Sequence, residues 1–329
     1  MNYSLGLKEQ KEFQISVMDI GSFMHEVLEE FSCYLTQNEI PWHSLLIEEE
    51  FQKVSNKLEE IINSKFNKIL IKNEENVRFF ILKNRLYNTM KKVVMVIATS
   101  FNQSEFLPAG YEISFSNNSV LAPIRIKIGE NSFMNIIGKI DRVDKYVNED
   151  TEYVRIVDYK SSARDLNLDD IKEGISLQLV TYLDAYIKNT QKNNKDKKII
   201  PAGMLYFNLS NNLVNIKEFT TDEEEIKNEV VKKLKLKGIF LSDVQILEKM
   251  DKNFKSKNSF IDITARSLEN KNKALKEDEY ESLLKETEEI LKNIGKEIMA
   301  GKVKIKPNKK ADYCKYCKFS DVCRKDICL

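Results

Sequence analysis

Two short segments of the chain carry side chains that together could cleave a phosphate ester. One is Gly138-Lys-Ile-Asp141-Arg-Val-Asp144, and the other is Val154-Arg-Ile-Val-Asp158-Tyr-Lys160. Residues two apart in a strand face the same side, so Asp158 and Lys160 would project together. Two carboxylates beside a lysine can bind Mg²⁺ or Mn²⁺, and the lysine can orient or deprotonate an attacking water and stabilise charge on the phosphate. The pattern therefore indicates metal-dependent phosphodiester hydrolysis.

Such a site requires Asp141 and Asp158 to lie side by side. The stretch from Asn148 to Thr151 has the composition of a turn and would fold the two segments into a hairpin, with Asp141 beside Asp158. The alternative interpretation is a surface salt bridge on an edge strand, which is common and contributes little. An Asp-X-Lys sequence taken alone favours that alternative.

Four further residues make the catalytic interpretation stronger. Gln178 and Tyr182 are four apart and share one face of a predicted helix, where the amide could contact a phosphate or Lys160 and the phenol could stack or donate a hydrogen bond. His25 adds a third metal ligand or a proton carrier, and Glu112 adds a weaker candidate carboxylate ligand. Each also has an ordinary explanation: a half-buried tyrosine, a surface or capping glutamine, a satisfied helix histidine, a solvated glutamate.

The elements that must position these residues follow from hydrophobic periodicity. Apolar residues spaced three and four apart from Ile20 to Phe31 predict an amphipathic helix capped by Asp19, and a helical pattern of two or three elements runs from Leu45 to Phe106. Pro108-Ala-Gly110 breaks this pattern. After the break we expect strands at 111–115, 124–128, 134–143, 153–159 and 202–208, helices at 168–188, 223–235 and 279–300, and a mobile loop at 251–276.

This order of elements predicts an α/β fold with a mixed central sheet flanked by helices. We expect one integrated domain with three parts, which are a helical layer at 1–107 that carries His25, a core at 108–240, and a helical extension with a cysteine-rich tail at 241–329. Five prolines and ten glycines in 329 residues argue against long flexible linkers.

Composition excludes several classes of protein. The chain has 52 Lys+Arg against 51 Asp+Glu and 42% apolar residues, which excludes a disordered polyelectrolyte or a histone-like basic protein. Its longest apolar run, six residues from Val93, is too short to span a membrane, and the N-terminus lacks the layout of a signal peptide, so we expect a cytoplasmic protein. No phosphate-binding glycine loop is present, so any ATP-driven activity would belong to another chain or to a missing part of this one.

The end of the chain combines cysteines with basic residues. Cys314, Cys317, Cys323 and Cys328 fall within the last sixteen residues, which in a reducing compartment indicates metal or iron-sulfur ligation before disulfides. An iron-sulfur cluster, Zn²⁺ and an empty tail remain open, with Cys33 as another candidate fourth ligand. Lysines interleaved with Tyr313, Tyr316 and Phe319 form a candidate surface for single-stranded DNA. The alternative is a solvated lysine-rich tail. The lysines include Lys309, Lys310, Lys315 and Lys318.

The order of these motifs resembles the RecB-family branch of the PD-(D/E)XK nucleases, and within it the nuclease domains of the B subunits of AddAB-type helicase-nucleases. The resemblance rests on Gly-Ser-Phe-Met-His25, Glu112, Gly-Lys-Ile-Asp141, Ile-Val-Asp158-Tyr-Lys160, Gln178-Leu-Val-Thr-Tyr182, a strand beginning at Pro201 and the cysteine tail. It implies a restriction-endonuclease-like fold. Asp141 and Asp158 would bind Mg²⁺ with His25, Glu112 and the Tyr159 carbonyl, and Lys160 would act in catalysis with Gln178 and Tyr182 as a supporting pair.

The resemblance also implies a biological role. The chain would be a metal-dependent exodeoxyribonuclease that acts on single-stranded or unwinding DNA ends during double-strand break repair by homologous recombination, with an AddA-type partner and the remainder of a longer chain. Alternatives are a stand-alone RecB-like nuclease and a nuclease-like DNA-binding or docking module without catalysis. In the family, three tail cysteines join an upstream cysteine to hold a 4Fe-4S cluster; here its counterpart would lie before Met1, which leaves Cys328 or Cys33 as the fourth ligand and suggests a fragment, an engineered version or a shortened gene product.

Overall fold

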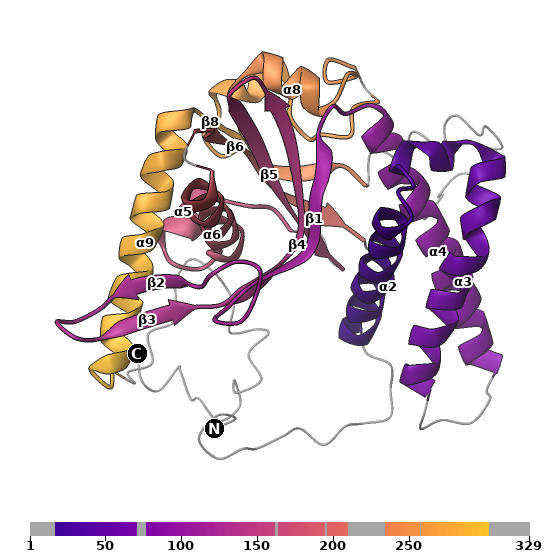
Figure 1. Ribbon diagram of the computed structural model, residues 1–329, viewed down its shortest axis with the longest axis horizontal. Helices are drawn as coiled ribbons and strands as arrows, with labels where there is room; N and C mark the ends of the chain where they lie inside the picture. Colours follow the sequence, from indigo (N-terminus) through magenta and orange to yellow (C-terminus); the bar gives the residue numbers. More distant parts are fainter. Residues whose placement is uncertain are drawn as a thin grey trace, which may run out of the picture.

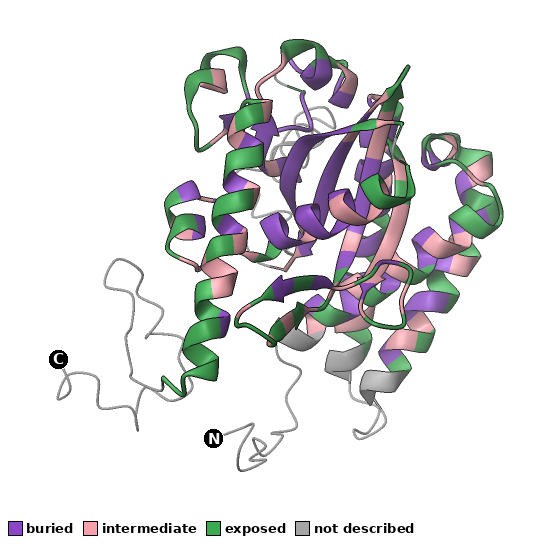
Figure 2. Ribbon diagram, turned by 60° about the vertical axis from the view of Figure 1, so that its left-hand side comes forward, coloured by how far each residue is buried: buried purple, intermediate pink, exposed green. Residues whose placement is uncertain are grey.

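The computed structural model describes residues 17–70, 77–161, 164–194, 196–209, 234–256 and 258–302. A twisted central sheet has one group of helices beside its first strand and another group across one of its faces (Figure 1). Buried residues lie along the strands and on the inner sides of the helices, and exposed residues lie on the outer sides (Figure 2). The predicted mixed sheet flanked by helices is therefore confirmed.

The central sheet has six strands in the order β1-β4-β5-β6-β7-β8. The pairs β1/β4, β4/β5 and β6/β7 are antiparallel, while β5/β6 and β7/β8 are parallel. The parallel β5/β6 pair requires a crossover, and helix α6 supplies it by packing on both strands. The strands are β1 (Leu107–Phe115), β4 (Gly138–Asn148), β5 (Thr151–Lys160), β6 (Lys198–Asn208), β7 (Leu236–Leu241) and β8 (Ala274–Leu275).

A helical layer stands beside β1. Its elements are α2 (Val17–Gln37), the 3-10 helix η1 (Trp42–Leu46), α3 (Glu48–Leu70) and α4 (Val77–Asn102). Polar contacts join this layer to the sheet, because Trp42 Nε1 donates a hydrogen bond to the Tyr111 hydroxyl at 2.7 Å and the Arg142 guanidinium lies 4.8 Å from the Phe101 ring centroid. The layer and the sheet thus share one core.

The remaining helices and a small second sheet complete the molecule. Helices α5 (Leu168–Lys172), α6 (Gln178–Asn193) and α9 (Glu277–Met299) lie across one face of the sheet, and α8 (Val244–Met250) lies at the top of the sheet in Figure 1. The 3-10 helix η3 (Ala265–Glu269) precedes β8. Strands β2 (Ile124–Lys127) and β3 (Phe133–Ile136) form a separate antiparallel ribbon beside α9.

Several expectations about element boundaries are wrong. Helix α2 already includes Val17, so Asp19 lies within the helix and does not cap it. The segment 168–188 contains two helices, because Gly174 adopts φ 78° after the first and ends it. The stretch 134–143 belongs to β3 and β4, which meet at Ile137.

Two regions expected to be irregular are regular or packed. Strand β1 runs through Pro108 and Gly110, and a register shift between them accommodates the proline. The segment 251–276, expected to be mobile, is organised by the buried Asp251 carboxylate, which accepts hydrogen bonds from the Asn253 amide, the Ser259 hydroxyl and the Phe260 amide. Most of the expected helix at 223–235 lies outside the described residues, and its last two residues are not helical.

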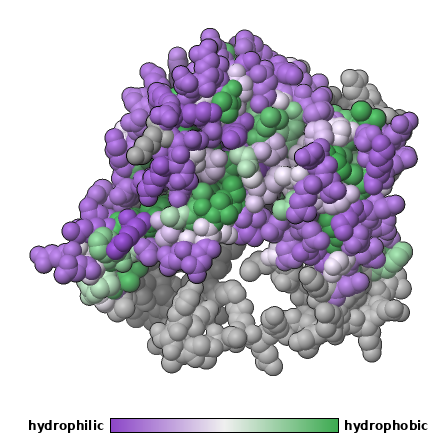
Figure 3. Space-filling view, in the orientation of Figure 1, coloured by the Kyte–Doolittle hydropathy of each residue, from purple (hydrophilic) through white to green (hydrophobic). Residues whose placement is uncertain are grey.

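The face of the molecule drawn in Figure 3 is mainly hydrophilic. On the face drawn in Figure 3, hydrophobic side chains gather in small separate areas and form no broad band. None of the helices in the described ranges has the length and apolar content needed to cross a membrane.

Candidate metal and nuclease site

Three carboxylates form a row across the first three strands of the sheet. Tyr111 and Ile113 pair with Arg142 and Ile140, which places Glu112 opposite Asp141. Arg142 pairs with Val157, and one step further along the ladder Asp141 lies opposite Asp158. Like charges on directly opposed residues destabilise a sheet. A row of this kind is therefore costly unless a cation lies among the carboxylates.

The Glu112 backbone is locally strained. Glu112 has φ 49°, in the left-handed region that non-glycine residues rarely adopt, and it follows the irregularity between Pro108 and Gly110. Its carboxylate pairs with Lys139 at 2.6 Å. Burial raises the pKa of Glu112 above its usual value, with Lys139 opposing that rise. Strained backbone of this kind is concentrated at functional sites.

Asp141 lies at the centre of the row. Its Oδ2 accepts a hydrogen bond from the Tyr159 backbone N–H at 2.8 Å and lies 3.4 Å from His25 Nδ1. Burial, followed by the neighbouring Asp158, raises the pKa of Asp141 to about 7. Without a bound cation, a large fraction of Asp141 side chains is therefore protonated at neutral pH.

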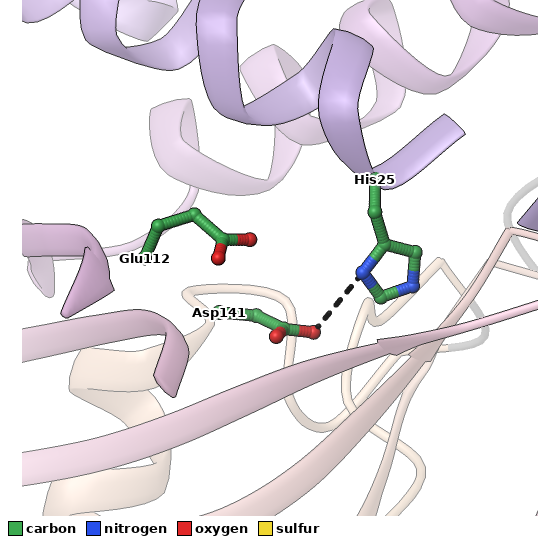
Figure 4. A group of neighbouring side chains, drawn as sticks. All are labelled: His25, Glu112 and Asp141. Carbon is green, nitrogen blue, oxygen red and sulfur yellow. Dashed lines mark ion pairs between the residues drawn. The ribbon is translucent and has the colours of Figure 1, made fainter. Parts of the chain in front are cut away.

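His25 reaches the sheet from helix α2. Figure 4 shows its imidazole pointing toward Asp141, with the Glu112 carboxylate also close to Asp141. Burial and then the Lys160 charge lower the pKa of His25, and a hydrogen bond with the Tyr159 backbone partly opposes them. A neutral imidazole is the form that binds metals. One ligand atom from each of His25, Glu112 and Asp141 lies within 4.8 Å of the others, so these three residues could hold one metal ion.

Asp158 and Lys160 form a second, adjoining group. Lys160 Nζ lies 2.5 Å from Asp158 Oδ2 and donates a hydrogen bond to Gln178 Oε1 at 3.2 Å. The Gln178 amide nitrogen donates to Asp158 Oδ1 at 3.1 Å and to the Tyr182 hydroxyl at 3.0 Å. Gln178 is the first residue of α6, so the start of that helix holds the glutamine over the end of β5. Asp158 is thus engaged with Lys160 and Gln178, and it lies outside the group of three possible ligands.

One open cleft of about 450 Å³ lies between α2 and the sheet, and its lining includes His25, Glu112, Asp141 and Lys160. Asp158, Gln178 and Tyr182 are not part of that lining. Close approach of α2 depends on Gly21, where a Cβ atom would lie 2.9 Å from Ser161 Oγ. Other α2 residues and the end of β5 complete its wall; the lining comprises Gly21, Ser22, His25, Glu26, Glu29, Glu112, Lys139, Asp141, Tyr159, Lys160 and Ser161.

The sequence interpretation missed several residues at or behind the site. Lys139 pairs with Glu29 on α2 as well as with Glu112, and Lys160 Nζ lies 5.6 Å from the Tyr206 ring centroid. The alternation of β4 could have identified Lys139, because it lies two residues before Asp141 and faces the same side. Tyr206 lies opposite Asp158 on β6. The sequence around Tyr206 contains no feature that would have indicated a place near the site.

A buried charged cluster lies on the opposite face of β4 and β5. The Arg142 guanidinium donates to both oxygens of Asp144, and Arg155 Nε donates to Asp144 Oδ2 at 2.8 Å. All three side chains are at most 1% exposed. Burial opposes ionisation of Asp144, yet the two arginines hold its pKa below the usual range. Arg142 directly follows Asp141, so this cluster fixes the backbone beneath the candidate site.

Most residues of the predicted cysteine and lysine sites lie outside the described ranges. Cys33 lies on α2 and is half-buried, and burial raises the pKa of its thiol. The remaining residues of these two sites lie outside the described ranges; they are Cys314, Cys317, Cys323 and Cys328 for iron-sulfur ligation, and Lys309, Lys310, Lys315 and Lys318 for DNA.

Comparison with known proteins identifies the family. The chain is 34% identical to an ATP-dependent helicase/deoxyribonuclease subunit of Ruminiclostridium cellulolyticum over 99% of this chain and 28% of that protein. The corresponding subunits of Acetivibrio thermocellus and Clostridium tetani are also 34% identical, over 100% of this chain and 29% of each relative. The chain thus spans less than a third of the length of these relatives. Residues 1–324 match the PD-(D/E)XK nuclease superfamily, and the chain belongs to that superfamily.

Proposed function

We propose that this chain is a Mg²⁺-dependent deoxyribonuclease module that hydrolyses phosphodiester bonds at single-stranded or unwinding DNA ends. The observation that carries the proposal is the row of Glu112, Asp141 and Asp158 beside Lys160, with His25 facing Asp141 from α2. Membership in the nuclease superfamily supports it.

The donor set fits a divalent cation. Carboxylate oxygens and one neutral imidazole are compatible with Mg²⁺ or Mn²⁺, and the raised pKa values of Glu112 and Asp141 are those expected of ligands without their cation. His25, Glu112 and Asp141 would hold the ion, with Asp158 and the Tyr159 carbonyl as proposed further ligands. When bound, the ion supplies positive charge that polarises the phosphate and lowers the pKa of water.

The side chains of the second group serve the reacting phosphate. Lys160 orients or deprotonates the attacking water and stabilises negative charge as it develops on the phosphate oxygens. Gln178 holds Lys160 and Asp158 at a fixed separation through its two hydrogen bonds. Tyr182 fixes the Gln178 amide, so it acts on Lys160 through that side chain.

The biological setting is part of the same proposal. The names of the relatives describe an ATP-dependent helicase/deoxyribonuclease made of subunits. We infer that this chain is the nuclease part of one such subunit, that it acts with an AddA-type partner, and that it serves double-strand break repair by homologous recombination in the cytoplasm. A 4Fe-4S cluster on the tail cysteines belongs to this proposal.

Cleavage of an end-labelled single strand with and without Mg²⁺ tests the proposed activity. The wild-type chain should degrade the strand with Mg²⁺ and leave it intact in EDTA, and Asp141→Asn should raise the Mg²⁺ concentration required for half-maximal rate at least about tenfold. Asp165→Asn, at an exposed aspartate outside the cleft, is the matched control. A wild-type chain that binds DNA but never cleaves it would favour a non-catalytic docking module.

A further inference from the structure

The β2–β3 ribbon presents an outward face that the core does not explain. Arg125 pairs with Asn135 and Lys127 pairs with Phe133, and all four side chains are exposed. The opposite face of the ribbon is apolar and packs inward through Ile124, Ile126, Met134 and Ile136. The ribbon thus has a buried side that anchors it and a basic, aromatic side that faces solvent.

Phe133 is the most informative residue on that outward face. Its side chain is 47% exposed, although large aromatic side chains are usually buried. The Arg125 guanidinium carbon lies 3.9 Å from the Phe133 ring centroid, a cation–π contact that orients both groups. An exposed aromatic ring beside a guanidinium is a surface on which a nucleic-acid base can stack while the charge meets a phosphate.

Helices α6 and α9 fix the ribbon in place. Asn189 on α6 makes two hydrogen bonds with the Ala122 backbone, accepting from its N–H at 2.8 Å and donating to its carbonyl at 3.0 Å. At Gly295 on α9, a Cβ atom would lie 2.9 Å from Ile128 and 3.0 Å from Met134, so the glycine permits close packing. A ribbon held from both sides loses little conformational entropy on binding.

The outward face continues along the chain into the cleft. Exposure alternates without interruption through Phe133, Asn135, Ile137 and Lys139, and Ile137 is 63% exposed. Lys139 lines the cleft, and Asp141 follows two residues later. At about 3.3 Å per residue, the path from Phe133 to Lys139 is about 20 Å long, which is enough for several nucleotides of an extended strand.

We propose that this face, comprising Arg125, Lys127, Phe133, Asn135, Ile137 and Lys139, is a binding track that guides one extended DNA strand into the cleft. Arg125 and Lys127 contact successive phosphates, and Phe133 stacks on a base. Lys139, which pairs with Glu29 and Glu112, lies where the track enters the cleft. This inference rests on the proposed deoxyribonuclease function and names the route of its substrate. Charge supports the choice of partner, because Glu130 is the one acidic residue of 124–139 and lies in the turn farthest from the cleft.

Equilibrium binding tests the track without requiring catalysis. A fluorescent single strand of about 20 nucleotides is titrated with the 329-residue chain in EDTA, and its anisotropy is measured at several salt concentrations. Phe133→Ala should weaken binding about tenfold. The double variant Arg125→Gln/Lys127→Gln should reduce the slope of log affinity against log salt by about 1.4, because two phosphate contacts are lost.

The matched control is Lys252→Gln, an exposed lysine in the loop after α8, which should leave affinity and salt slope unchanged. All substituted side chains are exposed, and a thermal melt of each variant verifies that the fold is retained. If both ribbon variants keep wild-type affinity and salt slope, the proposed track is wrong. The same result is expected if this face binds a protein and not DNA.

Cleavage assays on DNA substrates of two lengths separate this inference from the proposed function. With Mg²⁺, the ribbon variants should cleave a strand of about 20 nucleotides about tenfold less efficiently at limiting substrate, and should cleave a dinucleotide like wild type, because a dinucleotide held in the cleft does not reach Phe133. Loss of wild-type cleavage with ribbon-dependent binding retained would reject the nuclease and keep the track. Normal cleavage of both lengths by both ribbon variants would reject the track and keep the nuclease.

Discussion

The Asp141 carboxylate accepts a hydrogen bond from the Tyr159 backbone N–H at 2.8 Å. Tyr159 stands between Asp158 and Lys160, so this bond fixes the segment that carries both of those side chains to the central carboxylate of the row. Any change in the charge of Asp141, by a proton or by a cation, acts directly on the backbone that positions Lys160.

The raised pKa of Asp141 makes metal-free stability depend on pH. The pKa of the Asp141 carboxyl is raised to about 7 in the folded chain and is about 3.9 in the unfolded chain. Between about pH 4 and about pH 7, therefore, Asp141 binds a proton in the folded state only. Its contribution therefore lowers the free energy of unfolding as pH rises through this window. In EDTA, urea unfolding should show Asp141→Asn more stable than wild type by about 2–4 kcal/mol at about pH 8 and by much less at about pH 4. A difference that does not change with pH would contradict the assigned environment of Asp141.

Mg²⁺ should reverse that trend, because it competes with the proton for the same carboxylate. The dissociation constant for Mg²⁺, measured by calorimetry, should fall about tenfold per pH unit as pH rises toward about 7 and should level off above it. Asp141→Asn should bind Mg²⁺ weakly at every pH. Equal affinity at about pH 5.5 and about pH 8 would show that Asp141 is not a ligand.

Gln178 should be a positioning residue for Lys160. Gln178→Ala removes hydrogen bonds to Lys160, Asp158 and Tyr182, and should lower kcat roughly 10- to 100-fold while KM for DNA changes little. Because misplacement of Lys160 is the cause, the pH dependence of kcat should also shift. Gln191→Ala, on the same helix and away from this cleft, should retain wild-type kcat. Equal kcat in both variants would remove Gln178 from the site.

The buried arginine cluster should be essential for stability. Asp144→Asn leaves Arg142 and Arg155 without their shared counter-charge inside the protein, which should lower the free energy of unfolding by about 3–5 kcal/mol. The pKa of Asp144 is depressed, so its contribution is present above about pH 4 and disappears as pH falls below that value. Urea denaturation at about pH 7 measures the loss, with exposed Asp165→Asn as the control. A loss below about 1 kcal/mol would contradict this role.

The sequence predicted the central pair of the site because its geometry is local. Asp141 and Asp158 lie on neighbouring strands that one short turn connects, and strand alternation determines which side chains share a face. The place of Glu112 was harder to foresee, since Pro108 and Gly110 indicate a break, whereas the strand passes through them with a register shift and a left-handed residue. Those features depend on pairing with β4, which residue composition does not encode.

Other differences arise from long-range packing. The stretch 134–143 is continuous in sequence but divides at Ile137, because β3 pairs with β2 beside α9 while β4 enters the main sheet. The polar segment 251–276 is ordered by one carboxylate, that of Asp251. The end of α5 could have been predicted from the sequence, because a glycine such as Gly174 is a common signal for the end of a helix.

Lys160, held beside the carboxylate row, is expected to act on the phosphate during metal-dependent cleavage. The most direct measurement is the single-turnover rate of cleavage of an end-labelled single strand at saturating Mg²⁺ for wild type, Lys160→Ala and Lys145→Ala. Lys145 is the matched control, because it lies on β4 and pairs with Glu152 outside the cleft. We predict a loss of at least about 1,000-fold for Lys160→Ala and a change below about twofold for Lys145→Ala. Cleavage by Lys160→Ala at the rate of Lys145→Ala would show that Lys160 does not act on the phosphate.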